Sequence, residues 1–193
     1  MYKRQVYDRN RTFYTTISPS MDILISSNLE RLLYSVCGSD TEVAGYMAEL
    51  AGTGRYEVSD AVKAVIGKHF VGGYCSDDET KSAINKVYTE NGYLMDTHTA
   101  VAYNKLAAYR KDTGCVTPAV VVSTASPYKF CNSVLQALGQ ESDAPGTELI
   151  EKLSEVTKTA IPKPLEGLDR REKRFELVVD KPEMKATVAD FLK

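Results

Sequence analysis

The chain has 193 residues and a mass of 21.3 kDa, and 43% of its residues are hydrophobic and 26% charged. These proportions are ordinary for a globular protein and argue against disorder or a collagen-like architecture. The net charge of −2 provides no basic footprint for nucleic acid. The longest apolar runs fall well short of the roughly 20 residues that a membrane span needs. We therefore expect a cytoplasmic protein with neither a nucleic-acid nor a membrane partner, since the first residues are polar and show no signal-peptide pattern.

Cysteine and histidine usage predicts neither a disulfide framework nor a metal site. No Cys-x-x-Cys pair occurs, and His69 and His98 stand alone. We expect free thiols at the four cysteines, Cys37, Cys75, Cys115 and Cys131.

In the first half of the chain, a short apolar run at Ile23–Ile25 predicts a buried strand, and the spacing after it predicts a helix with Asn28 as its N-cap. Ser76 and Glu79 have the spacing of a capping box, in which each side chain bonds to a free backbone N–H of the first turn. Three consecutive helices are expected, at Thr41–Leu50, Asp60–Phe70 and from Ser76 to about Glu90.

In the second half, Pro118–Ser123 is the clearest strand candidate, because it is β-branched, uncharged and apolar on both faces, as a central parallel strand would be. Further helices are expected at Ala100–Arg110, Lys129–Leu138, Gly146–Thr157 and Lys181–Leu192. The strand–loop–helix order favours an α/β fold with a parallel sheet.

Ligands of parallel α/β folds gather at the carboxyl ends of the strands. Ser26, Ser27 and Asn28 follow the first predicted strand, and Ser123 and Thr124 end the second. The alternative is that these side chains only cap the helices that follow them.

Asp96, His98 and Ser123 contain the residue types of a hydrolytic triad, but sequence distance does not establish its geometry. A simpler interpretation of Asp96–Thr99 is a loop whose short polar side chains bond to their own backbone.

Four stretches of the chain together resemble threonine synthase, and more narrowly the carboxyl-terminal part of its long bacterial form. They are Val6–Arg11, Ser18–Leu33, Asp96–Tyr103 and Val121–Phe130. The resemblance implies the tryptophan-synthase-β-like fold of pyridoxal-phosphate enzymes, an α/β parallel-sheet sandwich, here incomplete and with a helical layer. It implies a lyase of threonine biosynthesis that converts O-phospho-L-homoserine and water into L-threonine and phosphate.

The chain also departs from that family. The Schiff-base lysine and the Gly-Asn-Phe-Gly loop, which holds the cofactor phosphate, belong to segments of the family that have no counterpart here. The expected organisation is therefore a truncation artefact at residues 1–5 and the carboxyl-terminal portion of the catalytic domain at residues 6–193. We expect this chain to be inactive alone and to need the missing amino-terminal portion of the same polypeptide as its partner.

The resemblance assigns roles to particular residues. It places Thr124 opposite the pyridine nitrogen of the cofactor, next to Ser123. Ser27, Asn28 and Arg31 are candidates for the substrate side of the cleft, because helix N-termini and arginine suit phosphate and carboxylate groups. The alternative for Arg31 is a solvated or Glu-paired side chain.

Two alternatives to the enzyme remain at the level of sequence. One is a non-catalytic module of the same fold that binds an amino acid or a phosphate ester. The other is a related enzyme such as a threonine dehydratase or cysteine synthase, against which the match over Ser18–Leu33 argues.

Overall fold

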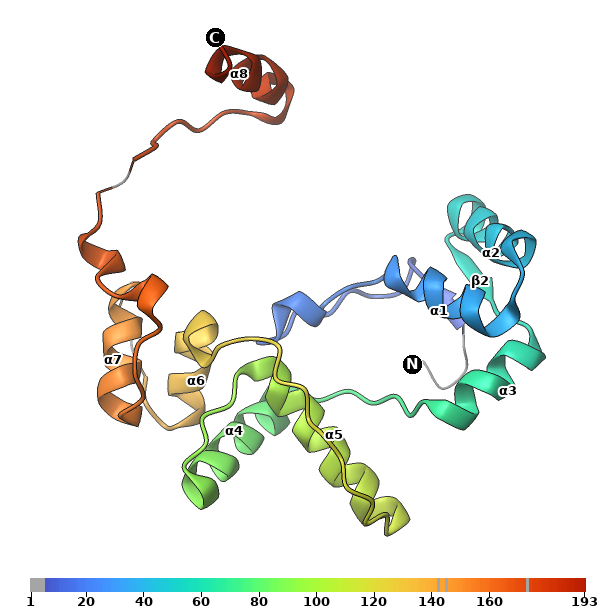
Figure 1. Ribbon diagram of the computed structural model, residues 1–193, viewed down its shortest axis with the longest axis horizontal. Coiled ribbons are helices and arrows are strands. Elements are labelled where there is room, and N and C mark those ends of the chain that lie inside the picture. Colours follow the sequence, from blue (N-terminus) through green and yellow to red (C-terminus); the bar gives the residue numbers. More distant parts are fainter. Residues whose placement is uncertain (1–5, 142, 145, 173) are drawn as a thin grey trace.

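The computed structural model describes residues 6–141, 143–144, 146–172 and 174–193. Helices dominate this part of the chain: α1 (Asn28–Cys37), α2 (Asp40–Thr53), α3 (Asp60–His69), α4 (Asp77–Asn91), α5 (Thr97–Thr113), α6 (Cys131–Ala137), α7 (Glu148–Thr157) and α8 (Met184–Phe191). Two short strands, β1 (Val6–Asp8) and β2 (Arg55–Glu57), pair antiparallel. The elements follow an open path, and α8 stands apart from the rest (Figure 1).

The first hydrophobic cluster, here called the amino-terminal cluster, joins α1, α2 and α3 to the β1–β2 pair. Its centre is Leu33, which is fully buried, and three tyrosine rings stack beside it. The ring centroids of Tyr7 and Tyr56 lie 4.8 Å apart, and those of Tyr46 and Tyr56 lie 5.4 Å apart. Stacking of this kind adds about 0.5–1.5 kcal/mol beyond the burial itself, so it supports the backbone pairing of the two short strands.

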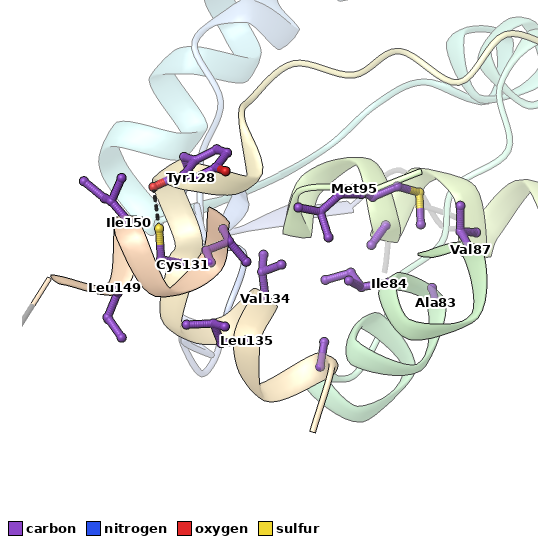
Figure 2. Packing of buried hydrophobic residues seen from close by; sticks show 14 residues of the cluster. Ala83, Ile84, Val87, Met95, Tyr128, Cys131, Val134, Leu135, Leu149 and Ile150 are labelled. Atoms are coloured by element: carbon purple, nitrogen blue, oxygen red, sulfur yellow. Dashed lines mark hydrogen bonds between the residues drawn. The ribbon is translucent and has the colours of Figure 1, made fainter. Parts of the chain in front are cut away.

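The second cluster, here called the carboxyl-terminal cluster, is formed by α4 to α7. Five of its residues are completely buried: Ile84, Ala100, Val134, Leu135 and Leu153. Figure 2 shows apolar side chains from these helices pointing toward one another. Cys131 also lies here, with its thiol donating to the carbonyl of Tyr128 at 3.0 Å.

The capping box predicted from Ser76 and Glu79 is confirmed. The Ser76 hydroxyl accepts from the Glu79 N–H at 3.2 Å, and the Glu79 carboxylate accepts from the Ser76 N–H at 2.8 Å. At its other end, α4 stops at Gly92, whose φ of +66° places it in the left-handed region that glycine adopts without strain. Local signals alone therefore set both ends of this helix.

The predicted strands are wrong for the part of the chain that the structure describes. Ile23–Ile25 and Pro118–Ser123 form no strand, and the sheet seen there is the antiparallel β1–β2 pair. Val120 is 89% exposed and Val122 is 66% exposed, although the pattern predicted burial on both faces. The physical reason is that a strand needs a neighbour that pairs with it through backbone hydrogen bonds, and no described segment forms such a ladder with either run. The parallel-sheet sandwich is therefore not seen here.

The last residues extend away from both clusters (Figure 1). Phe175, Val178 and Leu192 lie on this arm and are 75%, 90% and 82% exposed. Exposed apolar surface of this extent is typical of a face that another element covers.

Within the described residues, no helix combines the length and apolarity that a bilayer crossing requires.

Candidate functional site

The site begins at the first turn of α5, where Asp96 is the N-cap. Its carboxylate is 1% exposed and accepts hydrogen bonds from the N–H of His98 at 2.8 Å and of Thr99 at 3.1 Å. These are two of the four N–H groups that a helix start leaves without an intrahelical partner. Asp96 therefore bonds to backbone N–H groups next to it, as predicted, but the predicted loop is wrong, because Thr97–Thr99 form the first turn of α5.

The second carboxylate oxygen of Asp96 connects α5 to a distant loop. The Thr99 hydroxyl donates to Asp96 Oδ2, and Thr99 Oγ1 lies 3.0 Å from Ser123 Oγ. The Ser123 hydroxyl also reaches Asp96 Oδ2 at 3.5 Å. Ser123 precedes Thr124, which is exposed and has no hydrogen-bond partner among the described residues. The carboxylate of Asp96 and the hydroxyls of Thr99 and Ser123 thus fix the position of the loop that carries Thr124.

His98 lies beside this cluster and joins two further segments. Its Nδ1 is hydrogen bonded to the hydroxyl of Ser18, and its ring packs edge-on against Phe130, with centroids 4.7 Å apart. Burial lowers the pKa of His98 below its ordinary value, an effect that exceeds the opposing influence of the Asp96 carboxylate. The ring is therefore neutral at pH 7, and its buried Nε2 has no partner in the described structure.

The hydrolytic triad suggested by Asp96, His98 and Ser123 does not form. Ser123 contacts Asp96 and Thr99, whereas the imidazole of His98 bonds to Ser18. A nucleophilic serine needs the imidazole within hydrogen-bond reach to accept its proton. Asp96 and Ser123 are hydrogen bonded to each other, while His98 bonds to Ser18 instead.

The predicted substrate residues lie elsewhere, on the exposed side of the start of α1, whose apolar residues pack into the amino-terminal cluster. Ser27, not Asn28, is the N-cap, and Asn28 is the first residue of the helix, so the predicted cap is wrong. The Asn28 side chain instead accepts from Arg31 Nη2 at 2.7 Å, and both residues are exposed. Arg31 also lines an open hollow of about 490 Å³ between α1 and α2. The structure records no contact from this group to Ser123 or Thr124.

Sequence reasoning missed the roles of Ser18 and Thr99. Their partners lie 80 and 24 residues away, a distance over which a single sequence carries no pairing signal. The Asp-x-x-Thr spacing could have pointed to Thr99, because an N-cap carboxylate faces the third residue of its helix. Among the described residues, His, Cys, Asp and Glu side chains form no group of three that could hold a metal ion.

Two solved structures to which this chain is similar are threonine synthases. The threonine synthase from yeast matches with a TM-score of 0.81 at 28% identity, covering 98% of this chain and 39% of that chain. The pyridoxal-phosphate-bound threonine synthase from Brucella melitensis matches with a TM-score of 0.63 at 34% identity, covering 81% of this chain and 32% of that chain. This chain is thus similar in structure to about a third of each of these two threonine synthases.

Sequence comparison leads to the same family. Residues 99–189 match the family model described as "Threonine synthase, C-terminal". Human "Threonine synthase-like 1" is 38% identical over 135 residues, which is 68% of this chain and 18% of the human protein. This chain is therefore similar to the carboxyl-terminal part of threonine synthases, and the resemblance inferred from the sequence is confirmed. It spans between 18% and 31% of the length of the curated relatives that it matches.

Proposed function

We propose that this chain is the carboxyl-terminal part of a cytoplasmic, pyridoxal-phosphate-dependent threonine synthase. The complete enzyme would be a lyase that forms L-threonine and phosphate from O-phospho-L-homoserine and water. One observation carries the proposal: Ser123 and Thr124 are presented by a buried Asp96–Thr99 cap, inside the stretches that match threonine synthases. The pyridoxal phosphate bound by the Brucella relative supports the cofactor.

The residues around Thr124 fit this cofactor. A ring nitrogen can accept a hydrogen bond from a neutral hydroxyl, and the exposed Thr124 offers one without a competing partner in the described residues. The nearby carboxylate, Asp96, is 1% exposed and already bonded to the first turn of α5 and to Thr99, so it cannot act as a charged partner for the ring. When bound, the cofactor supplies an electron sink for the substrate carbanion. A neutral hydroxyl such as that of Thr124 would leave the ring nitrogen largely unprotonated. The ring would then withdraw electrons less strongly.

We propose Arg31 as the residue on the substrate side that binds the phosphate or carboxylate, with Ser27 and Asn28 beside it. The Asn28–Arg31 hydrogen bond holds the guanidinium at the start of α1, where backbone N–H groups also favour an anion. Guanidinium groups suit tetrahedral oxyanions because they donate two parallel hydrogen bonds.

The proposal requires a longer polypeptide, since this sequence contains no counterpart of the cofactor lysine and the phosphate-binding loop. The missing amino-terminal portion would complete the α/β parallel-sheet sandwich and would cover Val120 and Val122, the exposed valines of the predicted strand. The yeast threonine synthase supports this proposal. Its match covers 98% of this chain but only 39% of the longer yeast chain.

The test begins by sequencing the gene upstream of codon 1 and expressing the longest reading frame found. We expect a polypeptide with the lysine and glycine motifs that binds pyridoxal phosphate and releases phosphate from O-phospho-L-homoserine. In it, Thr124→Val should lower kcat while Thr124→Ser retains it. The 193-residue chain alone should show no turnover.

A reading frame that starts at Met1 would refute the enzyme proposal for this chain. Binding of O-phospho-L-homoserine by the 193-residue chain without turnover, measured by calorimetry, would then favour the alternative of a non-catalytic binding module. Arg31→Gln should abolish that binding if the anion site is the one proposed, with Arg171→Gln, on the carboxyl-terminal side of the chain, as a control.

A further inference from the structure

The loop that carries Ser123 and Thr124 has little support of its own. From Pro118 to Ala125 no backbone N–H or C=O is hydrogen bonded within the described residues, and Val120 is 89% exposed. The Ser123 side chain is the polar group through which this stretch is tied to the rest of the described structure. Whatever holds Ser123 therefore also sets the place of Thr124.

Thr99 is the residue whose contacts hold Ser123 in place. Its side chain is 3% exposed, its hydroxyl donates to Asp96 Oδ2, and its oxygen lies 3.0 Å from Ser123 Oγ. Asp96 in turn is fixed by the N–H groups of the first turn of α5. A rigid helix start is thus connected through one hydroxyl to an otherwise unsupported loop. Without that hydroxyl, Ser123 would keep only the 3.5 Å contact to Asp96, which is at the long limit for a hydrogen bond.

We infer that Thr99 is the positioning residue for the Ser123–Thr124 loop, acting through the Thr99–Ser123 hydroxyl pair. This inference rests on the proposed function, in which that loop faces the cofactor. In the proposed enzyme, Thr99 touches neither cofactor nor substrate. It restricts the loop to the position in which Thr124 can donate to the ring nitrogen, and so the loop does not have to be ordered when the cofactor binds.

The same helix turn contains a matched control. Thr97 is completely buried, like Thr99 a threonine of the first turn of α5, but its Oγ1 has no hydrogen-bond partner in the described structure. Thr97→Val and Thr99→Val make the same chemical change in equally buried positions. Thr97→Val removes no hydrogen bond, whereas Thr99→Val removes both the bond to Asp96 and the contact to Ser123. A difference between the two variants therefore reports on the hydrogen bonds of the Thr99 hydroxyl, and Ser123→Ala, described below, separates the loop contact from the bond to Asp96.

The first experiment measures loop order in the 193-residue chain by ¹⁵N relaxation. In Thr99→Val we expect the order parameters of the Ser123 and Thr124 amides to fall from the rigid range, about 0.85, to below about 0.6. Thr99→Ser, which keeps the hydroxyl, and Thr97→Val should keep the rigid values. Ser123→Ala removes the other end of the pair at an exposed position and should reproduce the loss even if Thr99→Val folds poorly. Unchanged order in both Thr99→Val and Ser123→Ala would overturn the inference.

The second experiment uses the longer polypeptide loaded with pyridoxal phosphate. One lost hydrogen bond of ordinary strength corresponds to roughly a fivefold change in an equilibrium. We therefore expect Thr99→Val to weaken cofactor binding about fivefold and to lower kcat with KM for O-phospho-L-homoserine unchanged, and Thr99→Ser to restore both. Lost loop order with unchanged cofactor affinity would overturn the positioning role. Wild-type polypeptide that binds no cofactor would refute the proposed function instead, while the relaxation result would still decide whether Thr99 holds the loop.

Discussion

Replacing Val120 by alanine tests directly whether the Pro118–Ser123 segment is uncovered in this chain. The change removes about two methylene equivalents, worth about 1.6 kcal/mol when the side chain is fully buried. Val120 is 89% exposed, so only about a tenth of that, about 0.2 kcal/mol, should be lost. Val134→Ala provides the matched comparison, because Val134 is completely buried in the carboxyl-terminal cluster (Figure 2). Its removal should cost about 2 kcal/mol, since a cavity remains.

Urea unfolding of both variants, followed by circular dichroism, measures these free energies. The expected result is a midpoint for Val120→Ala close to that of the wild type and a clearly lower midpoint for Val134→Ala. In the longer polypeptide, the cost of Val120→Ala should rise toward that of Val134→Ala, because the proposed sheet buries it. A loss above about 1 kcal/mol for Val120→Ala in the 193-residue chain would show that the segment is already covered, and the reasoning would be wrong.

Two further predictions concern helix caps and charge. Ser76→Ala removes the capping box with Glu79 and should destabilise the chain by about 1 kcal/mol, measured as a lower urea midpoint, and Ser76→Thr should retain most of it. Because burial depresses the pKa of His98 in the folded chain, the unfolded chain binds more protons, and stability should decline as the pH falls below about 6.5. His98→Gln should flatten that decline between pH 7 and 5, whereas the exposed His69→Gln should leave it unchanged; equal slopes in both variants would contradict the assignment.

Helix positions could largely be predicted because their signals are local. The expected helix ending near Glu90 and the observed α4 agree within a residue, since Ser76 and Gly92 act on backbone groups next to them in sequence. The predicted helix at Ala100–Arg110 was too short at both ends, because α5 begins at Thr97 and ends at Thr113. Apolar periodicity indicated only the middle of this helix. Its start was missed because its N-cap, Asp96, lies in a stretch that was interpreted as a loop.

The candidate site was only partly predictable. Ser123 and Thr124 were predicted from their place at the end of an expected strand; the strand is absent, and Ser123 is instead hydrogen bonded to the Asp96–Thr99 cap. The roles proposed for Thr124, Ser27, Asn28 and Arg31 toward cofactor and substrate stay predictions. Ser18, which bonds to His98 across 80 residues, could not be found, because no local pattern records a contact made by the folded chain.

The resemblance to threonine synthases and the ends of helices such as α4 could be read from the sequence, because they depend on residues close together in the chain. Which residues are buried could be seen only in the folded chain. Val120 and Val134 are the same residue type, yet one is 89% exposed and the other fully buried. Burial is a property of neighbours in space, and a strand without a pairing partner has none. For the same reason, the meeting of Asp96, Thr99 and Ser123 became visible only in the folded chain.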